Sequence, residues 1–249
     1  MSKILVIGDG CVDIHVYGRC DRLAPDSPVP VFVPNFRKTN LGMAGNVYQN
    51  VCSLGYPAVL KTNENRIEKK RYVHEETNHM FLRVDSSESK TERIGKIELD
   101  FLSEFSLIIV SDYNKGFLEE DDIKFICDNH NNVFIDTKKM IGDYCKNCKF
   151  IKINKNEYIR SKEFIDNSPW AYEKTIVTLG SKGCKLKDKI YSVDKVEIKD
   201  LCGAGDTFIA ALCVEFVKTL DIEKSLIFAN KCATQVVQQK GVNVVNEVF

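Results

Sequence analysis

A short glycine-rich segment near the C-terminal end of the chain, Gly203-Ala204-Gly205-Asp206, combines two kinds of chemistry. Gly203, Ala204 and Gly205 have small side chains or none, so an anion can approach their backbone closely. The apolar stretch 207–220 predicts that they open a helix, whose free N–H groups and positive dipole end favour phosphate. Beside a bound phosphate the Asp206 carboxylate is repulsive, but phosphoryl transfer needs a base that takes the proton of the attacking hydroxyl. The alternative is a glycine-rich turn in which Asp206 caps the helix.

Polar side chains that follow predicted strands form the second group of candidates. Asp13 comes after the first strand, where α/β proteins bind ligands, and can accept hydrogen bonds from substrate hydroxyls. Gly42 lies in a glycine-rich segment that leads to Asn46, whose amide both donates and accepts. Asn154 and Glu157 follow a later strand and can hold Mg²⁺ directly or through water, because magnesium takes oxygen ligands. Each has a structural alternative: a turn aspartate, a glycine loop, and a capping box formed by Asn154 and Glu157.

Three further features are suited to phosphate or to a nucleotide. Thr178, Gly180 and Gly183 belong to a glycine turn at the end of another strand, which suits the edge of a nucleotide. Lys138 also follows a strand and can meet a phosphate as a point charge, or can be a solvated lysine. The basic run Lys69-Lys70-Arg71 can contact an anionic sugar, or can form a solvated face. Because the ends of parallel strands share one edge of a sheet, we expect the groups at strand ends to line one cleft.

Short apolar strands that alternate with amphipathic helices predict the elements that position these residues. The strands are continuous β-branched runs, which is typical of a parallel sheet covered on both faces: 4–7, 58–61, 107–110, 133–135, 150–153 and 175–178. Helical spacing of apolar residues occurs over 44–54, 94–102, 123–126, 203–219 and 221–239. The sequence therefore predicts a single α/β domain over residues 1–249, with a mainly parallel sheet between helical layers.

Two parts of the chain do not follow this alternation. Residues 14–36 hold four of the six prolines and predict an extended edge segment, because proline is excluded from central strands. Residues 66–85 predict two strands joined by a turn, and with 14–36 they predict a small sheet outside the core, a lid. The edges of such a sheet need a cover, so we expect a homodimer formed through the lid. Further on, 184–193 predicts a hairpin, and 195–200 predicts a strand before the glycine-rich segment.

Composition narrows the class of protein. The 249 residues carry 35 basic and 35 acidic side chains, so no overall field attracts nucleic acid or a membrane surface. The sequence starts with a core strand instead of a signal peptide, and no apolar run reaches the ~20 residues of a membrane span. We therefore expect a cytoplasmic protein whose ten cysteines are free thiols. Cys127, His130, Cys145 and Cys148 resemble zinc-ligand spacing, but Cys127 belongs to an apolar helix stripe, and a predicted strand separates the two pairs.

In combination, these motifs resemble those of ribokinase-type (PfkB-type) carbohydrate kinases over nearly the whole chain. The Gly203–Asp206 signature, with Asp200 before it, carries most of the resemblance. Within the family the chain is similar to the kinase part of the bifunctional enzymes of ADP-heptose synthesis, in 22–31, in Ser111-Asp-Tyr-Asn-Lys-Gly116 and in 135–138. The resemblance implies a ribokinase-like three-layer sandwich with a small β lid. It also implies transfer of the ATP γ-phosphoryl group, with Mg²⁺, to a hydroxyl of a sugar or sugar phosphate such as a heptose 7-phosphate.

The resemblance also implies a role for each matched residue. Asp206 would be the base, and Gly203, Ala204 and Gly205 would form the anion hole. Mg²⁺ would be held by Asn154 and Glu157, and the sugar by Asp13, Gly42 and Asn46. The residues near the nucleotide would be Asn154, Lys138, Thr178, Gly180, Gly183 and Asn230. Two basic residues of the lid, Lys70 and Arg83, are further candidates for binding the sugar.

The chain departs from the family pattern in two ways. Met43 stands where the family has a second glycine, and its side chain can narrow the sugar pocket. The chain is also short after Asn63 and between Asn156 and Thr175. The alternative function is therefore a degenerate relative that binds sugar or nucleotide as a sensor or interaction partner, without catalysis.

Overall fold

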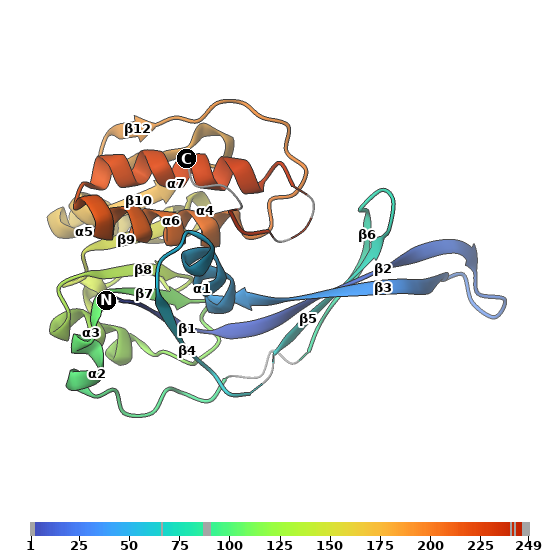
Figure 1. Ribbon diagram of the computed structural model, residues 1–249, viewed down its shortest axis with the longest axis horizontal. Helices are drawn as coiled ribbons and strands as arrows, with labels where there is room; N and C mark the ends of the chain where they lie inside the picture. Colours follow the sequence, from blue (N-terminus) through green and yellow to red (C-terminus); the bar gives the residue numbers. More distant parts are fainter. Residues whose placement is uncertain (1–2, 66, 87–90, 240, 242, 246–249) are drawn as a thin grey trace.

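A central eight-stranded sheet organises the protein. The computed structural model describes residues 3–65, 67–86, 91–239, 241 and 243–245, and Figure 1 shows their arrangement. In spatial order the strands are β12 (Lys189–Tyr191), β11 (Cys184–Leu186), β10 (Thr175–Thr178), β9 (Phe150–Asn154), β8 (Val133–Thr137), β7 (Phe105–Asp112), β1 (Lys3–Gly8) and β4 (Ala58–Thr62). The six from β4 to β10 pair in parallel, and β11 and β12 add the predicted antiparallel hairpin. The predicted mainly parallel α/β fold is therefore confirmed.

Helices cover both faces of this sheet. One layer contains α1 (Ala44–Ser53), α6 (Ala204–Thr219) and α7 (Ile222–Val236). The other contains α2 (Leu99–Ser103), α3 (Glu120–Asn129), α4 (Lys155–Asn167) and α5 (Pro169–Lys174). In β1, Ile4 and Val6 face the first layer, whereas Leu5 and Ile7 face the second. Both faces of each central strand are thus buried, which explains the continuous apolar runs.

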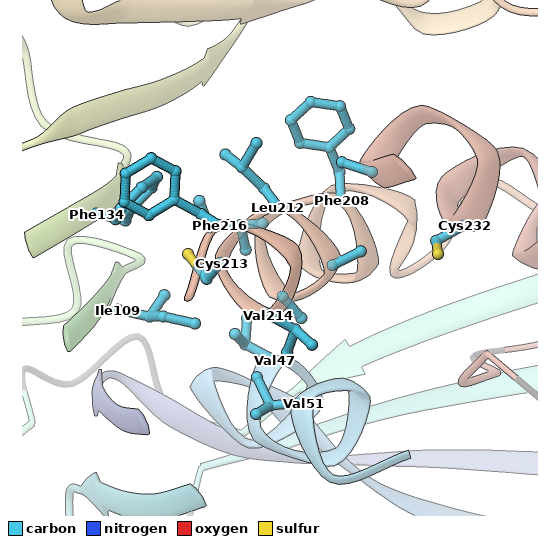
Figure 2. Packing of buried hydrophobic residues seen from close by; sticks show 14 of the residues in the cluster. Val47, Val51, Ile109, Phe134, Phe208, Leu212, Cys213, Val214, Phe216 and Cys232 are labelled. Atoms are coloured by element: carbon cyan, nitrogen blue, oxygen red, sulfur yellow. The ribbon is translucent and has the colours of Figure 1, made fainter. Parts of the chain in front are cut away.

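Helix α6 lies at the centre of the first layer. Figure 2 shows it between Val47 and Val51 of α1 and the sheet residues Ile109 and Phe134. Every residue from Asp206 to Val214 is buried, so this helix is enclosed nearly all round. Its N-terminus, which carries the glycine-rich segment, is therefore held firmly above the sheet.

A four-stranded sheet projects from the body and forms the predicted lid (Figure 1). Its order is β3 (Pro30–Met43), β2 (Gly10–Leu23), β5 (Glu68–His74) and β6 (Met80–Asp85). The segment predicted as a single edge strand is in fact part of a long hairpin, in which β3 is the edge strand. Pro34 lies where the β2–β3 register shifts, a position that needs no regular ladder hydrogen bond. Arg66, predicted to begin one lid strand, lies outside the described residues.

Two predicted elements, a helix over 94–102 and a strand over 195–200, were wrong. Tertiary hydrogen bonds explain the first. Of the helix expected over 94–102, only α2 forms. The N–H groups of Thr91 and Ile94 instead donate to the carbonyls of Lys115 and Phe117, so this segment lies against another loop. Residues 195–200 are irregular; the N–H groups of residues 199 and 200 both donate to the Val237 carbonyl. In the part of the chain that the structure describes, no helix is long and apolar enough to cross a membrane.

Candidate active site at the N-terminus of α6

The Asp206 carboxylate lies buried in the first turn of α6. Gly203 precedes the helix in the left-handed conformation, with φ 81°, which glycine adopts without strain. The carboxylate does not cap the helix. Instead, its Oδ2 accepts a hydrogen bond of 2.8 Å from Asn46 Nδ2, and its Oδ1 accepts one of 2.6 Å from the Tyr113 hydroxyl. Three elements far apart in sequence thus meet at Asp206, which is the residue predicted to act as base.

A buried network orients Asn46. Asn50, one turn later on α1, donates through Nδ2 to the Asn46 carbonyl at 2.9 Å and to its Oδ1 at 3.3 Å. Asn50 Oδ1 in turn accepts from the Thr207 hydroxyl at 3.0 Å. With its oxygen facing Asn50, the Asn46 amide presents its nitrogen to Asp206. Neither Asn50 nor Tyr113 was assigned a role from the sequence.

The surroundings of Asp206 have opposing effects on its pKa. Burial raises the pKa of this carboxyl, and it outweighs the hydrogen bonds from Tyr113 and Asn46, which lower it. The charges of Asp136 and Lys152 act in opposite directions, the first raising and the second lowering the pKa. A carboxyl whose pKa is raised in this way is a better proton acceptor than an exposed one.

A buried ion pair lies beneath the glycine-rich segment. Asp136 of β8 and Lys152 of β9 are cross-strand neighbours, each about 3% exposed, and Lys152 Nζ is 2.7 Å from Asp136 Oδ2. A Cβ placed on Gly205 would lie 3.0 Å from Lys152 Nζ, so the ammonium is next to the predicted anion hole. Lys152 is flanked by Ile151 and Ile153, which face the opposite layer. Its position inside an apolar strand gave no signal in the sequence.

Lys138 occupies the space between two carboxylates. Its Nζ is 2.5 Å from Glu157 Oε1 and 3.9 Å from Asp136 Oδ1, and it lies over the Tyr113 ring. Burial lowers the pKa of Lys138, but Asp136 and Glu157 raise it more, so the amine stays charged. Lys138 therefore lies at the reaction end of the site, near Asp206, and is not part of the wall of the nucleotide-sized cavity described below.

Asn154 and Glu157 form the capping box that was their structural alternative. Asn154 Oδ1 accepts from the N–H groups of Asn156 and Glu157, and Glu157 Oε2 accepts from the Asn154 N–H at 2.7 Å. This leaves Asn154 little capacity for a direct metal bond. Asp136 Oδ1, however, is buried without a hydrogen-bond partner. A Mg²⁺ ion that keeps most of its waters would share the Asp136 and Glu157 carboxylates with the Lys138 ammonium between them, since magnesium commonly uses one or two carboxylates plus phosphate oxygens.

The residues predicted to bind the sugar lie where the lid joins the body. The Asp13 carboxylate forms an ion pair with Arg71, and both side chains are nearly buried. A Cβ on Gly42 would lie 2.3 Å from Asp13 Oδ2, so only glycine leaves room for this carboxylate. The strand register pairs Asp13 with Lys69 and Ile14 with Lys70. Neighbouring residues of a strand face opposite sides.

The lid register therefore separates the basic residues proposed for the sugar. Lys69 and Arg71 share the Asp13 face, whereas Lys70 faces away and lies 3.7 Å from Glu68. Arg83 is opposite Arg71 on β6, on the same face, but it is half-exposed and paired with Asp85. The structure thus brings Lys69 and Arg71 to Asp13, while Lys70 is not brought there.

Met43 is buried and lies directly before the first residue of α1. Its φ of 56° is in the left-handed region. A non-glycine residue there is strained. Met43 belongs to a small buried cluster with Cys11 and Ile67, and Tyr113 packs against this cluster. The methionine that departs from the family pattern thus lies in the cluster beside Tyr113, the neighbour of Asp206.

A cavity of about 390 Å³ adjoins the other side of the glycine-rich segment. Four of the six residues predicted near the nucleotide line it, Thr178, Gly180, Gly183 and Asn230, together with Ala204 and Gly205, whereas Asn154 and Lys138 do not. Its remaining walls are mainly apolar and come from the 193–201 segment, α6 and α7. A largely apolar cavity of this size with a few polar groups suits a nucleotide base and ribose.

The zinc alternative has no geometric support. Cys127, Cys145 and Cys148 are buried in the apolar layer beside α3, where burial raises the pKa of each thiol. Within residues 3–65, 67–86, 91–239, 241 and 243–245, no three His, Cys, Asp or Glu side chains are grouped to hold a metal ion. All ten cysteines are free thiols.

Comparisons with known proteins concern the fold and the family. The chain is 28% identical over 290 aligned residues to the bifunctional protein HldE of a Nitratiruptor species, covering 96% of this chain. It spans about three fifths of that relative's length. Among solved structures, a Thermotoga maritima ribokinase has a TM-score of 0.71 at 18% identity, covering 97% of this chain and 95% of that one. An Arabidopsis thaliana ribokinase complexed with ribose and ATP has a TM-score of 0.68 at 17% identity, covering 97% and 94%.

The similarity to these structures confirms the ribokinase-like fold with its separate lid. A family model, described as pfkB family carbohydrate kinase, matches residues 124–248, half of the chain. The matched half contains the glycine-rich segment, Asp206, the Asp136–Lys152 pair and most of the cavity wall. The chain therefore belongs to the pfkB family of carbohydrate kinases, phosphotransferases whose acceptor is an alcohol group.

Proposed function

We propose that the protein transfers the γ-phosphoryl group of ATP to a hydroxyl of a sugar phosphate, of the type of a heptose 7-phosphate. The observation that carries this proposal is the position of Asp206, a buried carboxylate between a nucleotide-sized cavity and the lid. A base at the boundary between two binding regions is what transfer between two ligands requires. A sensor that only binds its ligands has no use for it.

The nucleotide side of the proposal rests on the cavity beside Gly205. In the Arabidopsis ribokinase, which shares the fold, the complex contains ribose and ATP. Here the cavity opens at the N-terminus of α6, so a nucleotide base inside it directs its phosphates toward the first turn of that helix, where backbone N–H groups and the positive dipole end favour an anion. Asn230 is held by its bond of 2.8 Å to the Tyr191 carbonyl and lines the cavity as a fixed wall.

The acceptor side rests on the charges of the lid. Asp13 can accept hydrogen bonds from sugar hydroxyls, and Lys69 brings a cation to the same face. Arg71 is already paired with Asp13, which leaves further guanidinium donors for a ligand. The similarity to HldE, at 28% identity, supports a heptose phosphate as the acceptor.

The mechanism follows from these positions. The acceptor hydroxyl donates its proton to Asp206 as its oxygen attacks the γ-phosphorus, and the bond to the β-phosphate oxygen breaks. The N–H groups at the start of α6 and the Lys138 ammonium stabilise the negative charge that develops on the transferred group. Asp136 and Glu157 would hold Mg²⁺ through water, and the bound ion would neutralise phosphate charge. Asn46 keeps Asp206 in position throughout.

Replacement of Asp206 by asparagine tests the proposal. Loss of the base is expected to reduce phosphoryl transfer by at least about a hundredfold, while the ATP dissociation constant changes little. A coupled ADP-release assay gives the rate, and isothermal titration gives the affinity. Asp166→Asn makes the same chemical change at an exposed ion pair on α4 and should keep full activity. Equal turnover in Asp206→Asn and the wild type would contradict the proposal.

A panel of acceptors distinguishes the substrate class. Heptose, hexose and pentose phosphates are compared with the corresponding free sugars, each with ATP and Mg²⁺. We expect the highest kcat/KM with a heptose 7-phosphate and a lower value without its phosphate, because Lys69 and Arg71 favour an anion. ATP binding without transfer to any of these sugars would support a sensor instead.

We also propose a homodimer formed through the lid, acting in the cytoplasm. The lid face opposite Asp13 exposes Leu41, Leu82 and Val84, and β3 and β6 are the edges of the lid sheet. Pairing with a second lid would cover both. Free cysteines suit a reducing compartment in which ATP is available. Light scattering at micromolar concentration should give twice the monomer mass; a monomer would count against the dimer.

A further inference from the structure

Tyr113 is the neighbour of Asp206 that the proposed mechanism does not yet use. It lies in the loop between β7 and α3, and its hydroxyl donates to Asp206 Oδ1 at 2.6 Å while Asn46 serves Oδ2. Each carboxylate oxygen has two lone pairs, so both donors leave room for one acceptor hydroxyl. The two bonds together fix the plane of the carboxylate.

The backbone of the Tyr113 loop is tied to the N-terminal strand. Asp9, which is fully buried, accepts hydrogen bonds from the N–H groups of Tyr113 at 2.7 Å and of Lys115 and Phe117 at 3.2 Å each. If the loop moved away, a buried carboxylate would lose three charge-assisted hydrogen bonds, which is costly. The loop therefore holds Tyr113 against Asp206 as a fixed part of the site.

The phenol is suited to donate without giving up its proton. Burial and the Asp206 charge raise the pKa of Tyr113 well above its usual range. Lys69 and Lys138 lie over its ring at 5.5 and 5.3 Å, which restrains its orientation. Tyr113 thus stays protonated at neutral pH, and its hydroxyl donates to Asp206.

We propose that Tyr113 is a positioning residue for phosphoryl transfer, which holds Asp206 charged and correctly oriented to take the acceptor's proton. The inference rests on the proposed function, in which Asp206 is the base. During transfer the acceptor O–H bond breaks, its proton moves to a free lone pair of Asp206, the new P–O bond forms, and ADP leaves with the electrons of the old one. Tyr113 neither gains nor loses a proton in this step.

The other charged groups around Asp206 set the background for this role. Asp136 of β8 disfavours the charged carboxylate, whereas Lys152 of β9 and Lys138 after β8 favour it. Cys11 of β2 is a neutral thiol at working pH, because burial raises its pKa to about 12. Among these groups only Tyr113 and Asn46 donate hydrogen bonds to the carboxylate. Loss of the phenol hydroxyl therefore removes one of these two hydrogen bonds.

The test replaces Tyr113 by phenylalanine and follows pH. Without the hydroxyl the pKa of Asp206 rises further, so the acidic limb of the kcat/KM profile moves to higher pH. We expect the ratio of wild-type to variant kcat/KM to be about tenfold larger at pH values below the acidic limb than at alkaline pH. Tyr172→Phe removes an exposed hydrogen bond of the same type, to Asp188, and should leave the profile unchanged. A thermal unfolding transition in each variant serves as the check that it is folded.

A second measurement does not depend on catalysis. In ligand-free protein labelled with ¹³C-aspartate, the Asp206 carboxyl resonance is assigned by its absence from Asp206→Asn, and it should titrate at higher pH in Tyr113→Phe than in the wild type. Identical titration, with an activity loss that is uniform in pH, overturns the positioning role. A shifted titration with an unchanged limb of kcat/KM shows that Asp206 is not the base, which overturns the proposed function and this inference with it.

Discussion

The two ends of the site are built on opposite principles. At the reaction end, Asp206, Asn46 and the Asp136–Lys152 pair are buried, and each side chain has a partner from another element. On the lid, Lys69, Lys70 and Arg83 are partly exposed, and their partners are lid neighbours, a ring or solvent. A buried charge without a partner lowers the free energy of unfolding by several kcal/mol, so buried charges need fixed partners. Exposed charges do not need them, because water solvates them. The reaction end is therefore rigid before any ligand binds. The exposed side chains of the lid become ordered only when the acceptor binds.

Arg71 and Asp13 belong to both regions. Their ion pair lies on the lid, but its side chains are only 12% and 11% exposed, close to the values of the reaction end. Gly42, at the end of β3, permits the pair by leaving space for the carboxylate. The junction of lid and body is thus as well ordered as the reaction end, and we expect an acceptor to bind here first.

The largest effect is expected from Lys152→Met at the reaction end. The substitution removes the close partner of the buried Asp136 and leaves it only the Lys138 ammonium at 3.9 Å, which should lower the free energy of unfolding by about 3–5 kcal/mol. Urea denaturation followed by circular dichroism measures this as a lower midpoint. In the double variant Lys152→Met/Asp136→Leu much of the loss should be recovered, because an apolar pair of similar volume needs no partner.

The exposed Lys162–Asp166 pair of α4 gives the matched control for Lys152. Lys162→Met should barely change the urea midpoint, because exposed pairs contribute little. Equal midpoints for Lys152→Met and Lys162→Met would contradict the contrast between buried and exposed charges.

A smaller effect on activity, confined to acceptor binding, is expected from Arg71→Gln at the junction. Loss of the guanidinium should raise the KM for a sugar phosphate about tenfold, the effect of one charge-assisted hydrogen bond, while the KM for ATP stays the same. Initial rates over a range of both substrates separate the two constants. Arg19→Gln, at an exposed lid ion pair with Glu75, should change neither constant. A parallel rise of the ATP and acceptor constants would argue that the two ends are not separate.

The contrast between the two ends also explains what the sequence predicted. The fold followed from apolar periodicity, since buried strands and helices repeat their pattern locally. Asp206, Asn46 and the cavity residues Thr178, Gly180 and Gly183 were found because their small-residue motifs are local too, whereas Asn230 came from the family resemblance alone. Tyr113 and Lys152 had no local signal: the first contacts a residue 93 positions away, and the second lies within an apolar strand. Lys70, and not Lys69 or Arg71, was chosen as the candidate for binding the sugar, because the sequence does not show on which side of the sheet each side chain lies. The pairing of Asp13 with Lys69 decides this.

The smallest effect is a gain in stability from Asp206→Asn. The folded pKa of Asp206 is raised above its ordinary value of 3.8, so between these two values the folded state binds more protons than the unfolded state. Stability therefore falls as pH rises through that window, and the charged carboxylate weakens the fold above it. Asparagine carries no charge, so the variant should be more stable at pH 7 by about 1 kcal/mol, or about 2–4 °C in Tm.

This gain should shrink as pH falls and vanish below 3.8, where aspartate is neutral in both states. Calorimetry at pH 7 and at the lowest pH at which the protein folds measures the difference. A variant that is less stable than the wild type at pH 7 would mean that the hydrogen bonds from Tyr113 and Asn46 outweigh burial, and that the reaction end is a stabilising network. A gain, by contrast, means that the base is kept charged at the expense of the fold, as expected of a residue retained for catalysis. No such conflict exists on the lid, where solvent screens every exposed charge.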